Sequence, residues 1–136
     1  MTLLVNEIRV VGDLRNSAIV QAADRMITVR GKFHSHRRKL FGINHLPAAV
    51  GYHGLAELGP GIFLSDWLPS FISHSHDTVT IEQFAVRLCD TLNHDVYKAR
   101  LRTSPSGFQV CGYNADGMPE LWYITNVKKM VGDEYC

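Results

Sequence analysis

Residues 2–24 read TLLVNEIRVVGDLRNSAIVQAAD, and this stretch decides which class of fold the chain can adopt. Residues 2–8 and 18–23 are short runs rich in apolar and β-branched side chains, which is typical of strands. Between them, residues 11–17 supply the Gly, Asp, Asn and Ser that favour turns. We therefore expect a β-hairpin here, with a generous loop between its two strands.

Strand-like segments continue along the chain. Residues 26–29, 40–43 and 47–52 are further short apolar runs. Residues 108–113 and 120–125 flank the sequence Asn-Ala-Asp-Gly, which is a strong signal for a hairpin turn. Strands are therefore expected on both sides of the middle of the chain.

The middle of the chain predicts helices. Apolar residues recur there at helical spacing and form one apolar face: Ile81, Phe84, Ala85, Leu88, Leu92 and Val96. Thr80 and Gln83 are spaced as a capping box at the start of this helix. Residues 55–72 are also apolar and predict a helix that is broken or kinked at Pro60 and Pro69. The order of hairpin, strands, helices and hairpin predicts an α+β fold.

Composition and charge exclude several classes of protein. With 136 residues, of which 46% are hydrophobic and 20% charged, the chain is expected to form a single domain over residues 1–136. A net charge of +1 argues against nucleic acid or a membrane surface as a partner, and no apolar run is long enough to span a bilayer. Cys89, Cys111 and Cys136 are odd in number and widely spaced, which favours reduced thiols and a cytoplasmic location.

Four segments, in this order, resemble the proteasome-type family of N-terminal nucleophile (Ntn) hydrolases. They are AIVQAAD at 18–24, KLFGIN at 39–44, HGLAE at 53–57 and CGYNADGMPELWY at 111–123. They are similar to that family's second strand, its lysine strand, the glycine turn before its first helix and its central hairpin. The resemblance implies a four-layer αββα sandwich, cleavage of peptide or amide substrates by a threonine, and assembly of identical copies into a ring.

The resemblance also implies which residues carry out the chemistry. Thr2 matches the nucleophile, provided that Met1 is removed, because an N-terminal threonine offers both a hydroxyl and an amine that takes its proton. Lys39 matches the lysine whose ammonium lowers the pKa of that amine by like-charge repulsion, and Asp24 matches the aspartate that holds the lysine. These three residues form the expected catalytic set.

The same resemblance implies the substrate-binding residues. The backbone of Thr28 is expected to line the cleft, and the backbone N–H groups at His53 and Gly54 are expected to form the oxyanion hole. Loss of one such donor typically costs about 3–4 kcal/mol of barrier in hydrolases. No metal and no cofactor are expected.

Three departures from the family pattern favour a second interpretation. The spacing from Thr2 to Asp24 is longer than usual and requires an insertion, His53 stands where the family usually has glycine, and the family's later elements have no counterpart after Tyr123. The sandwich is therefore expected to be incomplete at the C-terminus, as in a fragment or a shortened relative. The alternative function is that of a non-catalytic subunit of a proteasome-like ring that has lost the chemistry.

The candidate residues have simpler interpretations as well. Asp24 and Lys39 can form a purely structural ion pair, and residues 37–39 can be a solvated basic face. The pairs His34-Ser-His36 and His74-Ser-His76 would each place two imidazoles on one face of a strand, which suits a metal site. No H-E-x-x-H motif or suitably spaced cysteine accompanies them, so surface histidines are the preferred interpretation.

Overall fold

The computed structural model describes residues 3–29, 32–95 and 105–126 of the chain. Its strands and helices follow one another in this order: β1 (Leu4–Val11), β2 (Asp13–Ala23), β3 (Met26–Val29), β4 (Lys32–His36), β5 (Leu40–Ile43), β6 (Ala48–His53), β7 (Glu57–Gly59), β8 (Ile62–Phe63), α1 (Leu64–His74), α2 (Ile81–Asp95), β9 (Gly107–Tyr113) and β10 (Pro119–Thr125).

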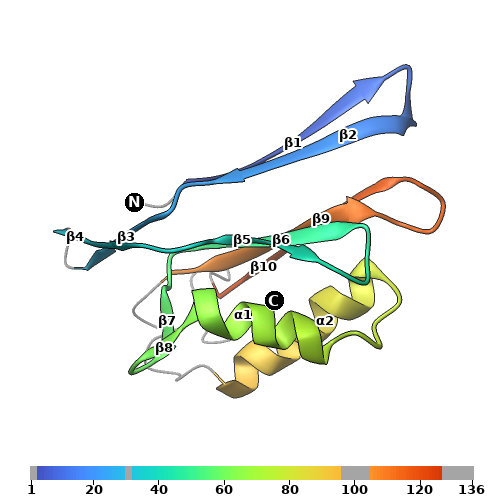
Figure 1. The fold of residues 1–136 in the computed structure, drawn as a ribbon. Helices are drawn as coiled ribbons and strands as arrows, with labels where there is room; N and C mark the ends of the chain where they lie inside the picture. Colours follow the sequence, from blue (N-terminus) through green and yellow to red (C-terminus); the bar gives the residue numbers. More distant parts are fainter. Residues whose placement is uncertain (1–2, 30–31, 96–104, 127–136) are drawn as a thin grey trace.

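A four-stranded antiparallel sheet forms the centre of the fold, with the strand order β10-β9-β6-β5. Figure 1 shows the β1–β2 hairpin on one side of this sheet and both helices, α1 and α2, on the other. The β3–β4 hairpin extends beyond the sheet, and the short β7–β8 hairpin leads into α1. The described residues therefore form three layers: a hairpin, a sheet and a pair of helices.

This architecture contradicts the four-layer αββα sandwich that the resemblance implies. Such a sandwich needs helices on both outer faces, whereas α1 and α2 cover the same face of the central sheet (Figure 1). Within the described part of the chain, no helix covers the β1–β2 hairpin. The reason is that the hairpin is followed by further short strands, while the apolar pattern of a helix occurs only in α1 and α2.

The hydrophobic core lies between the sheet and the helices. Successive side chains of a strand point to opposite faces, so alternate residues of β6 and β9 share the face that meets the helices. Val50, Tyr52, Phe108 and Val110 occupy this face and are at most 1% exposed. α2 contributes a matching apolar face, which consists of Ile81, Phe84, Ala85, Leu88 and Leu92. The helical spacing predicted for this segment is therefore confirmed.

The start of α2 is the predicted capping box. The Gln83 N–H donates to Thr80 Oγ1 over 3.1 Å, which satisfies one of the free donors at the helix start. In return, Gln83 Oε1 accepts a hydrogen bond from the Val79 N–H over 3.0 Å. Side chain and backbone thus cap each other, and the helix begins where the sequence predicts.

The helix predicted over 55–72 is wrong in its first half. The strands β7 and β8 occupy that half, joined by a turn in which Gly61 has φ +74°. Glycine adopts this left-handed conformation at little cost, and the preceding Pro60 cannot extend a helix. α1 begins only at Leu64 and then continues through Pro69.

The β1–β2 hairpin turns at a single residue, Gly12, rather than through the expected generous loop. Gly12 has φ +83°, which again suits glycine. The Asp13 carboxylate then accepts hydrogen bonds from the N–H groups of Arg15 and Asn16, at 2.9 and 3.1 Å. The polar residues of this segment therefore stabilise the start of β2 instead of forming a loop.

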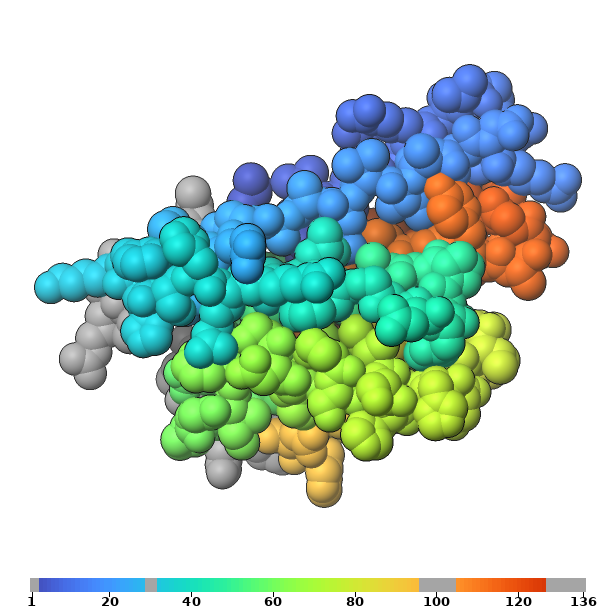
Figure 2. All heavy atoms as spheres, viewed as in Figure 1, coloured from blue at the N-terminus to red at the C-terminus, as the bar shows by residue number. Residues whose placement is uncertain are grey.

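Polar contacts hold this hairpin on the sheet. The Tyr113 hydroxyl donates to the Ser17 carbonyl over 2.8 Å and accepts from the Ile19 N–H over 3.0 Å. Gln21 Nε2 donates to the Gln109 carbonyl over 3.2 Å. Figure 2 shows the result, with the hairpin in blue lying against the β9–β10 turn in orange.

The cysteines differ from one another in their environments. Cys111 is free and buried, and its Sγ donates to Asn6 Oδ1 of β1 over 3.6 Å. Cys89 is disulfide-bonded, so the expectation of reduced thiols is wrong for this residue. Disulfide formation depends on distance in space, which spacing along the sequence does not reveal.

Of the two described helices, neither is long and apolar enough to cross a bilayer.

Candidate functional site

A buried lysine forms the centre of the candidate site. Lys39 immediately precedes β5, and its side chain is only 1% exposed. Its ammonium donates to Asp24 Oδ1 over 2.7 Å and to the Met26 carbonyl over 2.6 Å. Proteins retain a buried charge when it is paired and hydrogen-bonded, and these two acceptors meet that requirement.

Three segments of the chain converge on this ion pair. Asp24 follows β2, and its N–H donates to the Leu3 carbonyl over 3.0 Å, which holds the residue before β1 next to the carboxylate. The Lys39 carbonyl accepts from the Tyr52 N–H over 3.1 Å, which fixes the start of β5 against β6. Thr2, the predicted nucleophile, lies outside the described residues, but it is bonded directly to Leu3.

A cavity of about 640 Å³ opens beside this ion pair. It is lined by Ala23, Arg25, Arg38, Lys39, Leu40, Gly42 and Ala49. Leu40 and Gly42 alternate along β5 with the core residues Phe41 and Ile43, so they face the hairpin side of the sheet. The cavity is therefore bounded by the end of the β1–β2 hairpin and by the edge strand of the sheet. This cavity is open to solvent rather than enclosed.

Three cations border this cavity, and none of the described residues that line it is acidic. Arg38 is held in place, because its Nε donates to the Leu40 carbonyl over 2.7 Å and its guanidinium lies 5.0 Å from the centre of the Phe41 ring. Arg25 is exposed. Within residues 3–29, 32–95 and 105–126, no carboxylate pairs with either guanidinium. The cavity therefore favours anionic groups.

The predicted substrate-binding residues lie elsewhere. Thr28 is exposed on β3, within the hairpin that extends beyond the sheet. His53 ends β6, and Gly54 follows it with φ +85°. A Cβ at Gly54 would lie 2.1 Å from the Pro105 carbonyl oxygen, so only glycine fits there. None of the three predicted residues is among those that line the cavity.

Two groups on β6 have shifted pKa values. Burial raises the pKa of Tyr52 to about 12, and the Tyr52 hydroxyl donates to the Arg38 carbonyl over 3.1 Å. Burial lowers the pKa of His53, whose Nε2 lies 3.2 Å from the Tyr123 hydroxyl oxygen. Tyr52 therefore stays protonated at neutral pH and positions the residue before Lys39, while His53 favours its neutral form.

The two histidine pairs lie on different elements. His34 and His36 are exposed on β4, whereas His74 ends α1 and His76 lies in the turn after it. Both of the latter donate through Nδ1 to backbone carbonyls of α1, at 2.7 and 3.1 Å. In the part of the chain that the structure describes, no group of three or more His, Cys, Asp or Glu side chains is arranged to hold a metal ion.

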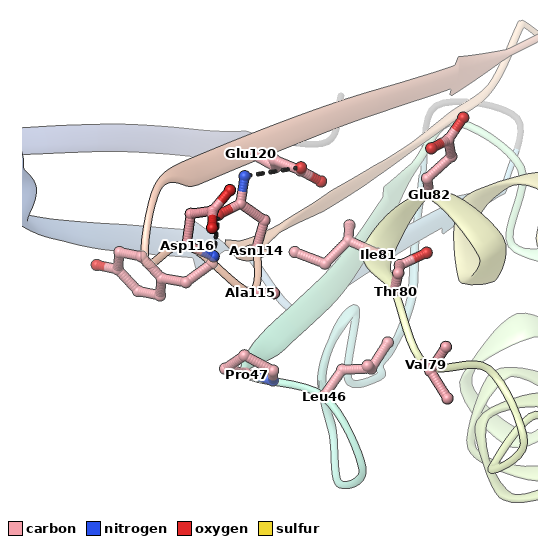
Figure 3. Close-up of a pocket in the computed structure, with 11 residues that line it drawn as sticks. Leu46, Pro47, Val79, Thr80, Ile81, Glu82, Asn114, Ala115, Asp116 and Glu120 are labelled. Atoms are coloured by element: carbon pink, nitrogen blue, oxygen red, sulfur yellow. Dashed lines mark hydrogen bonds between the residues drawn. The ribbon is translucent and has the colours of Figure 1, made fainter.

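A second cavity, of about 300 Å³, lies between the start of α2 and the β9–β10 turn (Figure 3). Its polar side chains already serve local structure. Asn114 Nδ2 donates to Glu120 Oε1 over 3.2 Å, and Asn114 Oδ1 accepts from the Asp116 N–H over 3.0 Å. Thr80 caps α2. This cavity shares no lining residue with the cavity beside Lys39.

Sequence reasoning missed the contributions of Met26, Arg25 and Arg38 to the site. Met26 acts through its carbonyl, which any residue supplies, so no sequence signal exists for it. Arg38 belongs to the basic run that was expected to be a solvated face. In the structure the three residues of this run have different environments. Lys39 is buried, Arg38 borders the cavity and Arg37 binds α1.

No protein-family model, curated protein or solved structure matches this chain. A function must therefore be argued from the geometry of the chain itself. That geometry consists of a buried and paired ammonium next to the beginning of β1, together with a cavity whose walls are cationic.

Proposed function

We propose that the chain is a threonine-type peptidase or amidohydrolase in which Thr2 is the nucleophile, once cleavage of the preceding bond frees its amine. One observation carries the proposal: the buried Lys39 ammonium pairs with Asp24, whose N–H holds the Leu3 carbonyl over 3.0 Å. Leu3 is bonded to Thr2, so chain connectivity limits how far the Thr2 hydroxyl can lie from the ion pair.

In the proposed mechanism, the Thr2 hydroxyl attacks the carbonyl carbon of an amide, and its proton passes to the α-amine of the same residue. The Lys39 ammonium lowers the pKa of that amine by like-charge repulsion and so keeps it available as a base, while Asp24 fixes the lysine. The protonated amine then gives its proton to the leaving nitrogen, and the C–N bond breaks. Water finally hydrolyses the acyl-threonine ester and releases the second product.

The cavity beside Lys39 supports this proposal because it offers a place for a substrate. Among the described strands, β5 is at the edge of the four-stranded sheet, and two of its residues line the cavity. An edge strand presents unpaired backbone groups with which an extended peptide can pair. A peptide added to β5 would pass along the side of the cavity.

An electrophile and mass spectrometry test the proposal. An epoxyketone reacts with the hydroxyl and the amine of an N-terminal threonine, so we expect one covalent adduct, on Thr2. Thr2→Ala should abolish the adduct and the hydrolysis of peptide amides, whereas Thr2→Ser should retain both. Lys39→Met should slow labelling by about 100-fold in protein that circular dichroism shows to be folded. Hydrolysis that survives Thr2→Ala, or an active protein that retains the residue before Thr2, contradicts the proposal.

A second candidate function is that of a non-catalytic subunit in an assembly of identical copies. It is favoured by exposed apolar side chains on the outer face of the β1–β2 hairpin, where Val5 is 45% and Val20 is 40% exposed. Clustered exposed apolar residues often mark protein–protein interfaces. Sedimentation velocity measures the assembly. An oligomer that the epoxyketone does not label favours this function, and a monomer contradicts it.

A further inference from the structure

The β1–β2 hairpin is a two-stranded sheet, and β1 forms one of its two edges. The sequence of β1, LVNEIRVV, contains neither proline nor lysine, which are the residues that commonly protect an exposed edge. Ile8, Val10 and Val11 of this strand are 41%, 49% and 73% exposed. In Figure 1, β1 lies at the margin of the molecule. A long and apolar edge strand of this kind is a template on which another strand can pair.

The hydrogen bonds of the hairpin show which backbone groups point to this edge. The Asp24 N–H donates to the Leu3 carbonyl over 3.0 Å, so the backbone of Leu3 faces β2. Because the direction alternates along an antiparallel strand, the odd-numbered residues of β1 also face β2. Asn6, Ile8 and Val10 therefore direct their N–H and carbonyl groups outward. None of the described strands pairs with these groups.

The other edge of the hairpin is already occupied. On β2, the Ser17 carbonyl accepts a hydrogen bond from the Tyr113 hydroxyl over 2.8 Å, and the Ile19 N–H donates to that hydroxyl over 3.0 Å. A further strand could pair with β2 only by displacing Tyr113. The edge of β1 is therefore the open one.

The sequence of β1 is complementary to itself when two copies run antiparallel. With Ile8 opposite Ile8 of a second copy, Glu7 of each copy lies opposite Arg9 of the other. In these pairs the backbone groups point away from each other, and this is where facing side chains approach most closely. The side chains of Glu7 and Arg9 are 51% and 64% exposed, so both are accessible to a partner. This charge complementarity favours a second copy over a strand of unrelated sequence.

We infer that β1 pairs with β1 of a second copy, about a two-fold axis at Ile8, and that the two hairpins form one antiparallel sheet. This inference does not rest on the proposed hydrolase. A two-fold contact uses the same surface of both copies and closes after two chains, so it differs from the head-to-tail contact of a ring. Pairing also stabilises the hairpin, because two strands alone are marginally stable in water.

Hydrogen exchange at several protein concentrations tests this pairing, with sedimentation velocity to measure the fraction of dimer. The amides of Glu7 and Arg9 face β2 and should be protected at every concentration. The amides of Asn6, Ile8 and Val10 should exchange about tenfold more slowly, or slower still, in the dimer than in dilute protein. A dimer without this alternating gain of protection overturns the inference. A monomer at every concentration also overturns it and leaves the edge to a different protein.

A proline variant blocks the edge without removing a hydrogen bond of the hairpin. Ile8→Pro lacks the outward N–H, and proline is tolerated at an exposed edge. We expect it to raise the dissociation constant of the dimer about tenfold or more, since the two-fold axis doubles the loss. Ile8→Val keeps the N–H and is the matched control, with an unaltered dissociation constant. A dimer that Ile8→Pro does not weaken overturns the inference.

Charge variants test the register and leave every backbone group in place, so they serve where the proline variant fails to fold. Glu7→Arg puts like charges opposite each other and should weaken the dimer about tenfold. Glu7→Arg/Arg9→Glu restores opposite charges across the axis and should restore the wild-type dissociation constant. A double variant as weak as Glu7→Arg overturns the inference.

Labelling by the epoxyketone separates this inference from the proposed function. A monomer that the epoxyketone labels on Thr2 supports the hydrolase and overturns the pairing of β1. A dimer that pairs through β1 and is not labelled supports the pairing and contradicts the hydrolase. An unlabelled monomer contradicts both.

Discussion

Lys39 and Asp24 form an unequal pair: the ammonium lies 2.7 Å from the carboxylate, yet the lysine side chain is 1% exposed and the aspartate side chain 28% exposed. The buried ammonium has little access to water and depends on its protein partners. The carboxylate keeps contact with solvent. Loss of one partner therefore has a different consequence from loss of the other.

The first prediction concerns this inequality. Asp24→Ala leaves a buried charge without its counter-ion and should lower the free energy of unfolding by about 3–5 kcal/mol. Lys39→Met keeps a side chain of similar volume and leaves a carboxylate that water can solvate, so we expect a loss of about 1–2 kcal/mol. Urea denaturation of both variants measures the difference. Equal losses of stability in the two variants would contradict the prediction that Lys39 depends on Asp24 more than Asp24 depends on Lys39.

The second prediction concerns the turn after β6. Gly54 has φ +85°, and a Cβ there would lie 2.1 Å from the Pro105 carbonyl oxygen. Gly54→Ala should therefore cost about 3 kcal/mol or more, from backbone strain together with the clash. Gly117 has φ +75° with no atom within 4 Å of an added Cβ, so Gly117→Ala isolates the backbone strain and should cost about 1 kcal/mol. Thermal unfolding of the two variants measures their losses of stability. Similar losses would show that the structure relieves the clash between the alanine Cβ at position 54 and the Pro105 carbonyl.

The third prediction concerns the docking of the hairpin. Tyr113→Phe removes the hydroxyl that bonds both Ser17 and Ile19, and the resulting unpaired groups should cost about 1–3 kcal/mol. Hydrogen exchange of the Ile19 amide should accelerate. Tyr123→Phe is the comparison: it removes a hydroxyl that lies 3.2 Å from His53 Nε2, but the residue is 54% exposed, so water can replace this contact and the cost should stay below about 1 kcal/mol. Unchanged exchange at Ile19 in Tyr113→Phe would show that the hydroxyl does not hold the hairpin.

The fourth prediction concerns pH. Burial lowers the pKa of His53 in the folded state below its ordinary value of 6.5. Below about pH 6.5 the imidazole of His53 is therefore protonated more readily in the unfolded chain than in the folded protein. Stability should be greatest above that pH and should fall as the pH falls toward the folded pKa. His53→Gln should reduce the loss of stability between about pH 7.5 and pH 5.5 in urea denaturation. His74→Gln, at an exposed position, is the matched control, and an equal slope in the wild type and His53→Gln would exclude His53 as the cause.

The sequence predicts those elements whose signals are local. α2 follows from helical spacing and from the contact between Thr80 and Gln83, and the β9–β10 hairpin follows from the turn after Asn114. The helix that the sequence predicts for residues 55–63 is wrong, because a short apolar run fits either a strand or a helix. The number of layers depends on contacts between distant segments, which periodicity does not encode.

For the candidate site as well, the sequence predicts some of the residues and not others. Asp24 and Lys39 are identified by residue type, and the structure brings them together. The sequence does not predict that Arg25 and Arg38 border the same cavity as Lys39, since neighbouring basic residues differ in their contacts once the chain folds. Thr28, His53 and Gly54 rest on the resemblance alone, and none of them lines the cavity.

Cys111 gives the molecule its own reporter of hairpin movement. Its thiol lies beneath β1, where Sγ donates to Asn6 Oδ1, and burial raises the pKa of the thiol. The reactive thiolate is therefore scarce at neutral pH as long as the hairpin stays on the sheet. The rate at which an alkylating reagent modifies this residue, followed by peptide mapping, consequently measures how often the first two strands detach from their neighbours.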